Sequence, residues 1–134
     1  MRLASLLALA LALACAAREP TPDATYRAFA RAAGERDAER TWGLLSSDTR
    51  AWLDAQAKTV AASAPGVVAP TGRQLVLGDA ALARRPLASV LVLRESPERA
   101  LVEATEEGGA KREVELVREE GSGWRVRIPP PPGS

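Results

Sequence analysis

The hydrophobic pattern of this chain changes its period at Pro86, and this change constrains the fold more than any other feature. Before Pro86, apolar residues recur at the spacing of an amphipathic helix; after it, they largely alternate with charged residues, as in half-buried strands. Helices in one part of a chain and strands in the other are typical of an α+β domain. We therefore expect N-terminal helices packed on a curved antiparallel β-sheet.

Capping residues and breakers predict three helices in the first part of the chain. Their expected starts are Thr21, Asp37, and Ser46 or Ser47. Pro22 suits the first turn of the first helix, and Gly34 suits its end. The third helix is expected to reach about residue 62 with an inward face made of Leu53, Ala57, Val60 and Ala61. Residues 74–83 favour a further helical segment over a strand.

Strands are expected at residues 87–93, 99–106, 112–119 and 124–128, separated by glycine- and proline-containing turns. Alternation gives the sheet an apolar inner face and a charged outer face. The expected inward residues are Ala100, Val102, Ala104, Val114, Leu116, Trp124, Val126 and Ile128.

The same alternation predicts the register of the last hairpin, because inward residues must share a face. A three-residue turn at 120–122 pairs Leu116 with Val126. It also places Arg118 opposite Trp124, where a cation–π contact can form.

The first 14 residues have the pattern of a secretory signal peptide: one arginine, a run of leucine and alanine, then small residues. Such a run is too short to cross a bilayer core of roughly 30 Å as a helix. The segment 11–15 resembles the lipobox of bacterial lipoproteins, in which the cysteine is acylated and becomes the new N-terminus. Cys15, the chain's one cysteine, is therefore the expected lipid-attachment site.

Two other interpretations of Cys15 stay open. Residues 12–14 also satisfy the Ala-x-Ala rule of ordinary signal peptidase, whose cut would release a soluble protein with a free thiol. Alternatively, Cys15 is an ordinary apolar residue of the leader. The lipoprotein interpretation is favoured because a lone cysteine in an exported chain otherwise has no partner.

The expected organisation is a signal peptide at 1–14, a lipidated tether at 15–20, one domain at 21–129 and a proline-rich tail at 130–134. Loss of the leader removes Arg2, so 18 basic residues become 17, against 17 acidic residues. This balance excludes a global basic field for nucleic acid. Ala16, rather than aspartate, follows Cys15, and this indicates the outer membrane rather than the inner one.

Segments 26–29, 34–37, 46–50 and 114–126, together with Trp42, resemble the nuclear transport factor 2-like (cystatin-like cone) superfamily. More narrowly, they are similar to small bacterial lipoproteins of unknown function in that superfamily. The resemblance implies a cone in which aromatic residues of the first helix pack on the sheet and the final tryptophan closes the core. Its members include polyketide cyclases, ketosteroid isomerases, dehydratases and binding or structural modules, so the resemblance implies a fold rather than an activity.

Catalysis is not expected. The chain has no histidine, and the expected inward strand positions are apolar. Among these positions, only the indole N–H of Trp124 can donate a hydrogen bond. Ser46 and Ser47 have no basic residue nearby in the pattern to activate them. No phosphate-binding loop, nucleotide fingerprint or metal-spacing motif occurs, so no cofactor and no metal are expected.

Candidate interaction residues are few. Trp52 is out of phase with the inward face of its helix and, if exposed, would mark a pocket rim or interface. Arg84 and Arg85 are candidates for contact with a partner. Glu103, Glu113 and Glu115 lie on the outer sheet face, either as a calcium-type cluster or, as base rates favour, as a solvated face neutralised by Arg99, Arg125 and Arg127.

The sequence thus predicts a membrane-anchored cell-envelope lipoprotein that serves as a non-catalytic binding or assembly module. Its expected partners are the membrane, through the N-terminal lipid, and an envelope protein. The alternative is a small cone-fold enzyme, or a carrier of an apolar small molecule, that uses the mouth of the cone.

Overall fold

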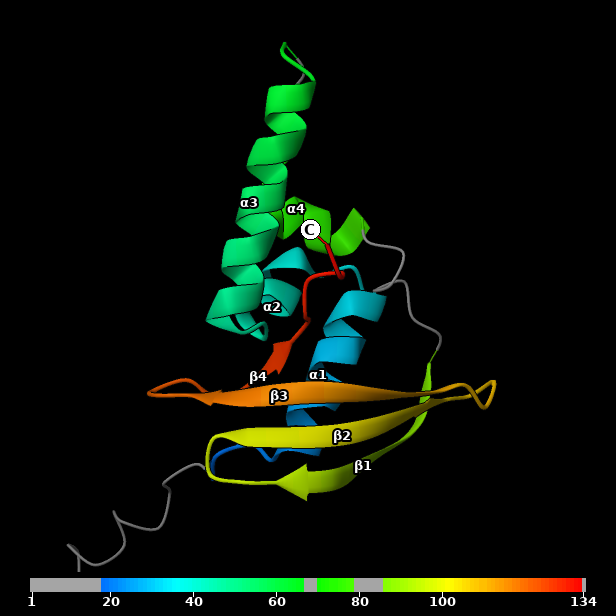
Figure 1. Cartoon of the computed structure of the whole chain (residues 1–134). Coiled ribbons are helices and arrows are strands. Elements are labelled where there is room, and N and C mark those ends of the chain that lie inside the picture. Colours follow the sequence, from blue (N-terminus) through cyan, green and yellow to red (C-terminus); the bar gives the residue numbers. More distant parts are fainter. Residues whose placement is uncertain (1–17, 67–69, 79–85, 134) are drawn as a thin grey trace, which may run out of the picture.

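Helices precede strands in the folded chain, as the change of pattern at Pro86 predicts (Figure 1). The computed structural model describes residues 18–66, 70–78 and 86–133. Within them the elements are α1 (Pro22–Gly34), α2 (Ala38–Gly43), α3 (Ser47–Ser63), α4 (Gly72–Gly78), β1 (Leu87–Glu95), β2 (Arg99–Glu106), β3 (Lys111–Glu119) and β4 (Gly123–Arg127). The α+β class is therefore confirmed, and the four strands form an open antiparallel sheet rather than a closed one.

Two of the three expected caps form. An Asp37 carboxylate oxygen accepts the backbone N–H of Arg40 at 3.0 Å, at the start of α2. The Ser46 hydroxyl accepts the backbone N–H of Thr49 at 3.4 Å, at the start of α3. Thr21 occupies the N-cap position of α1, but its side chain makes no capping hydrogen bond.

The sheet has the strand order β1-β2-β3-β4, and the register of its last hairpin is the predicted one. Leu116 pairs with Val126, and Arg118 pairs with Trp124. The Arg118 guanidinium carbon lies 5.6 Å from the centroid of the Trp124 ring, which confirms the predicted contact. The turn at 120–122 contains Gly121 with φ 73°, a left-handed conformation that glycine adopts without steric cost.

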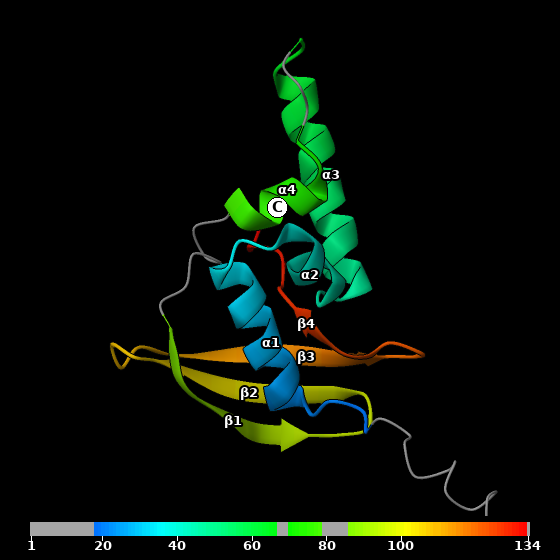
Figure 2. The ribbon, with the colours of Figure 1, turned by 180° about the vertical axis from the view of Figure 1, so that it is seen from behind.

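Helix α1 covers the inner face of the sheet, whereas α2, α3 and α4 pack on one another beside β4 (Figures 1 and 2). Tyr26 and Phe29 of α1 lie in the core with ring centroids 6.0 Å apart. The expected inward strand residues are buried, except that Val114 and Ile128 are partly buried and pack against the core. The apolar inner face predicted from alternation is therefore confirmed.

Residues 44–46 extend the sheet at its β4 edge. Backbone hydrogen bonds join Val126 N–H to the Leu44 carbonyl at 2.8 Å, and Ser46 N–H to the Val126 carbonyl at 2.9 Å. Leu45, which lies between them, is fully buried. This parallel bridge fixes the start of α3 against the end of the sheet.

The expectation for the far half of α3 was wrong. Val60 was expected to face inward, but it is 44% exposed. The buried residues of this helix are Thr49, Leu53 and Ala57, all in its first eleven positions. The C-terminal end of α3 projects beyond the sheet and the other helices (Figures 1 and 2), and Val60 is exposed among the described residues.

Strand β1 is an edge strand with an unusual surface. Leu91 is 56% exposed and Leu93 43% exposed, although the run from Leu87 to Leu93 is almost continuously apolar. Val90 is the buried residue of this strand. Register shifts in its pairing with β2 break the alternation, and one of them lies next to Leu93.

Candidate functional site

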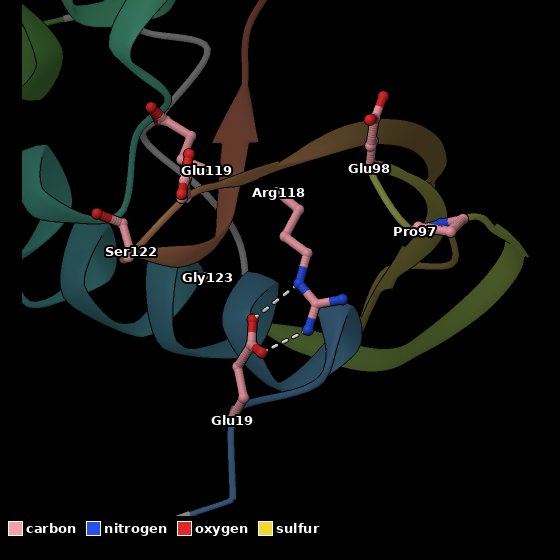
Figure 3. Close-up of a pocket in the computed structure, with 9 residues that line it drawn as sticks. Glu19, Pro97, Glu98, Arg118, Glu119, Ser122 and Gly123 are labelled. Carbon is pink, nitrogen blue, oxygen red and sulfur yellow. Dashed lines mark hydrogen bonds and ion pairs between the residues drawn. The ribbon is translucent and has the colours of Figure 1, made fainter.

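A hollow lies at the end of the sheet where the turns β1–β2 and β3–β4 meet the start of the folded chain (Figure 3). Its volume is about 570 Å³. The lining residues are Glu19, Pro97, Glu98, Arg118, Glu119, Glu120, Gly121, Ser122 and Gly123. They come from three segments that lie far apart in the sequence.

An ion pair between Glu19 and Arg118 closes one side of this hollow (Figure 3). The Arg118 Nε donates to one carboxylate oxygen of Glu19 at 3.1 Å, and its Nη2 donates to the other. This two-point geometry is the strong form of an arginine–carboxylate pair. The hydrogen bond from Arg118 lowers the pKa of the Glu19 carboxyl, and the same bond raises the pKa of Arg118.

The β3–β4 hairpin is shaped to receive the Glu19 side chain. Gly123 has φ 76°, and a Cβ added there would lie 3.0 Å from a carboxylate oxygen of Glu19. On its other side, the Arg118 guanidinium lies over the Trp124 ring. The arginine and the glycine of one hairpin therefore contact Glu19, and the Trp124 ring lies against the arginine. We call this contact, made by Glu19 with Arg118 and Gly123, the N-terminal clamp.

The rest of this hollow is acidic. Glu98, Glu119 and Glu120 line it, and none of them has an ion-pair partner among the residues that the structure describes. Glu119 accepts the backbone N–H of Ser47 at 2.8 Å. Because Arg118 is already paired, the lining carries three carboxylates in excess.

A second hollow, of about 350 Å³, lies where the chain leaves β4 at Pro129. Tyr26 and Phe29 of α1 line it from the inner side, with Arg112 and Val114 of β3. The hollow thus connects the surface with the side chains that α1 packs on the sheet.

Arg112 is an inward charge that the sequence analysis did not include. It pairs with Ala104 in the sheet and therefore shares the face of Val114 and Leu116. Its Nη2 forms an ion pair with Glu106, and both side chains are mostly buried. The alternation of β3 could have predicted this inward position, because Arg112 lies two positions before Val114 and therefore shares its face.

The phenol of Tyr26 belongs to the same group of polar atoms. Burial raises its pKa, and the positive charge of Arg112 partly offsets this effect. The Arg112 Nε is sealed from solvent and has no hydrogen-bond partner in the described part of the chain. A phenol and a guanidinium thus converge on a mostly apolar hollow.

Two of the three predicted carboxylates of the outer sheet face, Glu103 and Glu115, are paired with basic residues, whereas Glu113 forms no ion pair among the described residues. Glu103 accepts from Lys111 at 3.2 Å. Glu115 accepts from Arg99 at 2.8 Å and from Arg127 at 2.9 Å. Arg125, the third expected arginine, donates to the carbonyl of Trp124 instead. Across 18–66, 70–78 and 86–133, no group of three or more metal-ligating side chains lies close enough to hold an ion.

The remaining predicted site residues are only partly covered by the structure. Trp52 is partly buried and packs against the core, and its indole N–H is sealed without a partner among the described residues. The Trp52 ring is therefore only partly exposed to solvent. Cys15, Arg84 and Arg85 lie outside the described residues, and so do the expected leader at 1–14 and the first half of the expected tether, 15–17.

Comparisons with known proteins add no relative. No protein-family model matches the chain, and no curated protein or solved structure is significantly similar to it. None of the helices in the described ranges has the length and apolar character needed to span a membrane.

Proposed function

We propose that this protein is a membrane-anchored cell-envelope lipoprotein whose folded domain is a non-catalytic binding or assembly module. The observation that carries the proposal is the lipobox-like segment 11–15, which ends four residues before Glu19. The ion pair of Glu19 with Arg118 supports it, because the folded domain then begins directly beside the acylated residue.

Substitution of the cysteine tests the anchor. In cells labelled with palmitate, the wild-type chain is expected to incorporate label and to partition into the detergent phase. Cys15→Ser should lose both properties, whereas the control Ser5→Ala in the leader should keep them. A mature chain that begins at Cys15 but reacts with a thiol-alkylating reagent would refute the proposal, since a thioether-linked cysteine cannot react.

The binding role is favoured over catalysis by the chemistry of the inner face. The Ser46 hydroxyl, one of the two serine side chains considered as nucleophiles, is occupied at the start of α3, where it donates to Asp48 and accepts the backbone N–H of Thr49. Without histidine, the chain lacks the base that most often activates a hydroxyl. We propose an envelope protein as partner and the outer membrane as location. Crosslinking in native envelopes, followed by identification of the linked protein, tests both.

The finer fold remains a proposal as well. We infer a cone-like, nuclear transport factor 2-like arrangement because Tyr26 and Phe29 of the first helix pack on a twisted sheet and Trp124 is buried. The sheet has four strands and stays open. An experimental structure in which residues 79–85 extend the sheet toward closure would support the cone, whereas a flat open sheet would refute it.

The alternative function is a carrier or small enzyme that uses the second hollow. Tyr26 and Arg112 favour it, because two polar side chains converge there on apolar walls. An apolar fluorescent anion, anilinonaphthalene sulfonate, should then bind the folded domain. Val114→Trp, which fills the hollow, should abolish that binding, whereas Val117→Trp, at the neighbouring outward position, should not. Equal binding by both variants would remove the alternative.

A further inference from the structure

The N-terminal clamp limits how far the folded domain can move from a lipid on Cys15. Four peptide units separate Cys15 from Glu19, and they span at most about 14 Å when fully extended. The headgroup layer of one leaflet accounts for about 5–8 Å of that distance. Without the clamp, the free tether would run to the start of α1 at Pro22. The clamp therefore shortens the tether by nearly half.

The short tether selects one end of the sheet. The hollow of Figure 3, between the turns β1–β2 and β3–β4, contains Glu19 itself and lies within the reach of the tether. The turn β2–β3 lies at the other end of strand β2, whose eight residues span about 26 Å. That distance exceeds the length of the tether. A lipid on Cys15 therefore keeps the end with the turns β1–β2 and β3–β4 nearer to the membrane than the end with the turn β2–β3.

We propose that the surface formed by the turns β1–β2 and β3–β4 rests against the bilayer, with lipid headgroups that carry ammonium groups as its partner. The proposal rests on the acylation of Cys15 proposed above. The side chains of Glu98, Glu119 and Glu120 supply the charge complementarity, since the hollow has three carboxylates in excess. None of the described residues that line the hollow has a large apolar side chain, so this surface lies at headgroup level and does not insert into the acyl chains.

This orientation has a consequence for partners. The turn β2–β3 then lies away from the membrane surface, where a protein in the periplasm or exterior can reach it. The exposed apolar residues of β1, Leu91 and Leu93, remain accessible along the side of the sheet. Arg118 acts as a positioning residue because it sets the length of the free tether and contacts no lipid itself.

A fluorescence-quenching experiment on the lipidated full chain tests the orientation. Because an acylated Cys15 does not react, a single introduced cysteine can be labelled uniquely. Ser122→Cys places the label in the turn β3–β4, and Ala110→Cys places it in the turn β2–β3; both native side chains are exposed. The vesicles contain phosphatidylethanolamine, phosphatidylcholine and a lipid with a quencher on its headgroup. We expect several-fold stronger quenching at position 122 than at position 110.

Substitutions of the clamp test its part in this orientation. Arg118→Gln should reduce the difference between the two labels, whereas Arg99→Gln, which breaks another exposed ion pair of the sheet, should preserve it. The charge exchange Glu19→Arg with Arg118→Glu should restore the difference. Replacing phosphatidylethanolamine with phosphatidylglycerol should weaken quenching at position 122, because the acidic hollow is repelled by an anionic surface.

The outcomes separate this inference from the proposed function. Equal quenching at positions 122 and 110, in protein whose mass shows the lipid on Cys15, would overturn the orientation and leave the lipoprotein proposal intact. A mature chain without lipid would overturn the proposed function, and the orientation with it. Stronger quenching at position 122 that Arg118→Gln leaves unchanged would overturn the role of the clamp.

Discussion

The hydroxyl of Thr49 connects the start of α3 with the end of β4, and its removal gives a sharp test of the fold. Thr49 is 2% exposed, and its Oγ1 accepts the backbone N–H of Ile128 at 3.0 Å. It also lies 2.9 Å from the hydroxyl oxygen of Ser46. The substitution Thr49→Val keeps the shape of the side chain and removes the oxygen, so the Ile128 N–H loses its acceptor.

The expected cost follows from that orphaned donor. A buried N–H without an acceptor destabilises a protein by about 1–3 kcal/mol. For a domain of this size, each kcal/mol lowers the melting temperature by about 4–8 °C. Thr49→Ser keeps the oxygen and loses one methyl group, which costs about 0.5–1.5 kcal/mol by analogy with Ile→Val. Thr49→Val should therefore be the less stable of the two.

Urea unfolding, monitored by tryptophan fluorescence, measures both free energies. The matched control is Thr59→Val in the exposed half of the same helix, where the hydroxyl donates to the carbonyl of Ala55. That change leaves no donor without an acceptor and should lie within about 0.5 kcal/mol of wild type. If Thr49→Val were as stable as Thr59→Val, the buried hydroxyl would not hold the end of the sheet to α3.

Three further predictions concern the core and two titrating groups. Leu116→Ala, at a fully buried position, should lower the free energy of unfolding by about 2–5 kcal/mol in urea unfolding. The control Leu91→Ala, at the exposed edge, should change the same free energy by about 0.5 kcal/mol or less. Tyr26 is the chain's one tyrosine, so phenolate absorbance at alkaline pH reports this residue alone. Because burial disfavours the phenolate, the pKa of Tyr26 should lie above 10.0 in the folded protein and return to 10.0 in denaturant. The hydrogen bond from Ser46 lowers the pKa of Asp48 in the folded protein. The stability that the ionised Asp48 contributes is therefore present above pH 3.8 and is lost as the pH falls through the lower folded pKa. Asp48→Asn should remove that part of the acid dependence of the melting temperature, and an unchanged dependence at acid pH would contradict the prediction.

Local features of the chain predicted the elements that local physics controls. The caps at Asp37 and Ser46 were predictable because a side-chain oxygen beside three free backbone N–H groups acts within one helical turn. The register of β3 and β4 was predictable because an odd shift would place Leu116 and Val126 on opposite faces and expose one of them.

Features that depend on neighbours far along the chain were predicted poorly or not at all. The inward spacing at Val60 describes a helical face but does not say whether another surface meets it, and in the described part of the structure Val60 is exposed. In the same way, the apolar run of β1 indicated a strand but not its place at the edge of the sheet. Whether a hydrophobic residue is buried is decided by packing rather than by its own periodicity.

In the candidate site too, local patterns predict some features, whereas others depend on residues far along the chain. Arg112 could have been placed on the inner face from the parity of β3, but its burial beside Glu106 required the pairing of β2 with β3. The contact of Glu19 with Arg118 joins residues 99 positions apart, and no sequence pattern links them.

The sequence by itself determined the α+β class, the helix starts, the apolar inner face and the register of the last hairpin. These follow from interactions within a few residues or from the two-residue period of a strand. Only the tertiary structure decided which edge stays open, which charges turn inward and where the N-terminal segment is held. Those depend on contacts between distant segments, which exist only after the chain has folded.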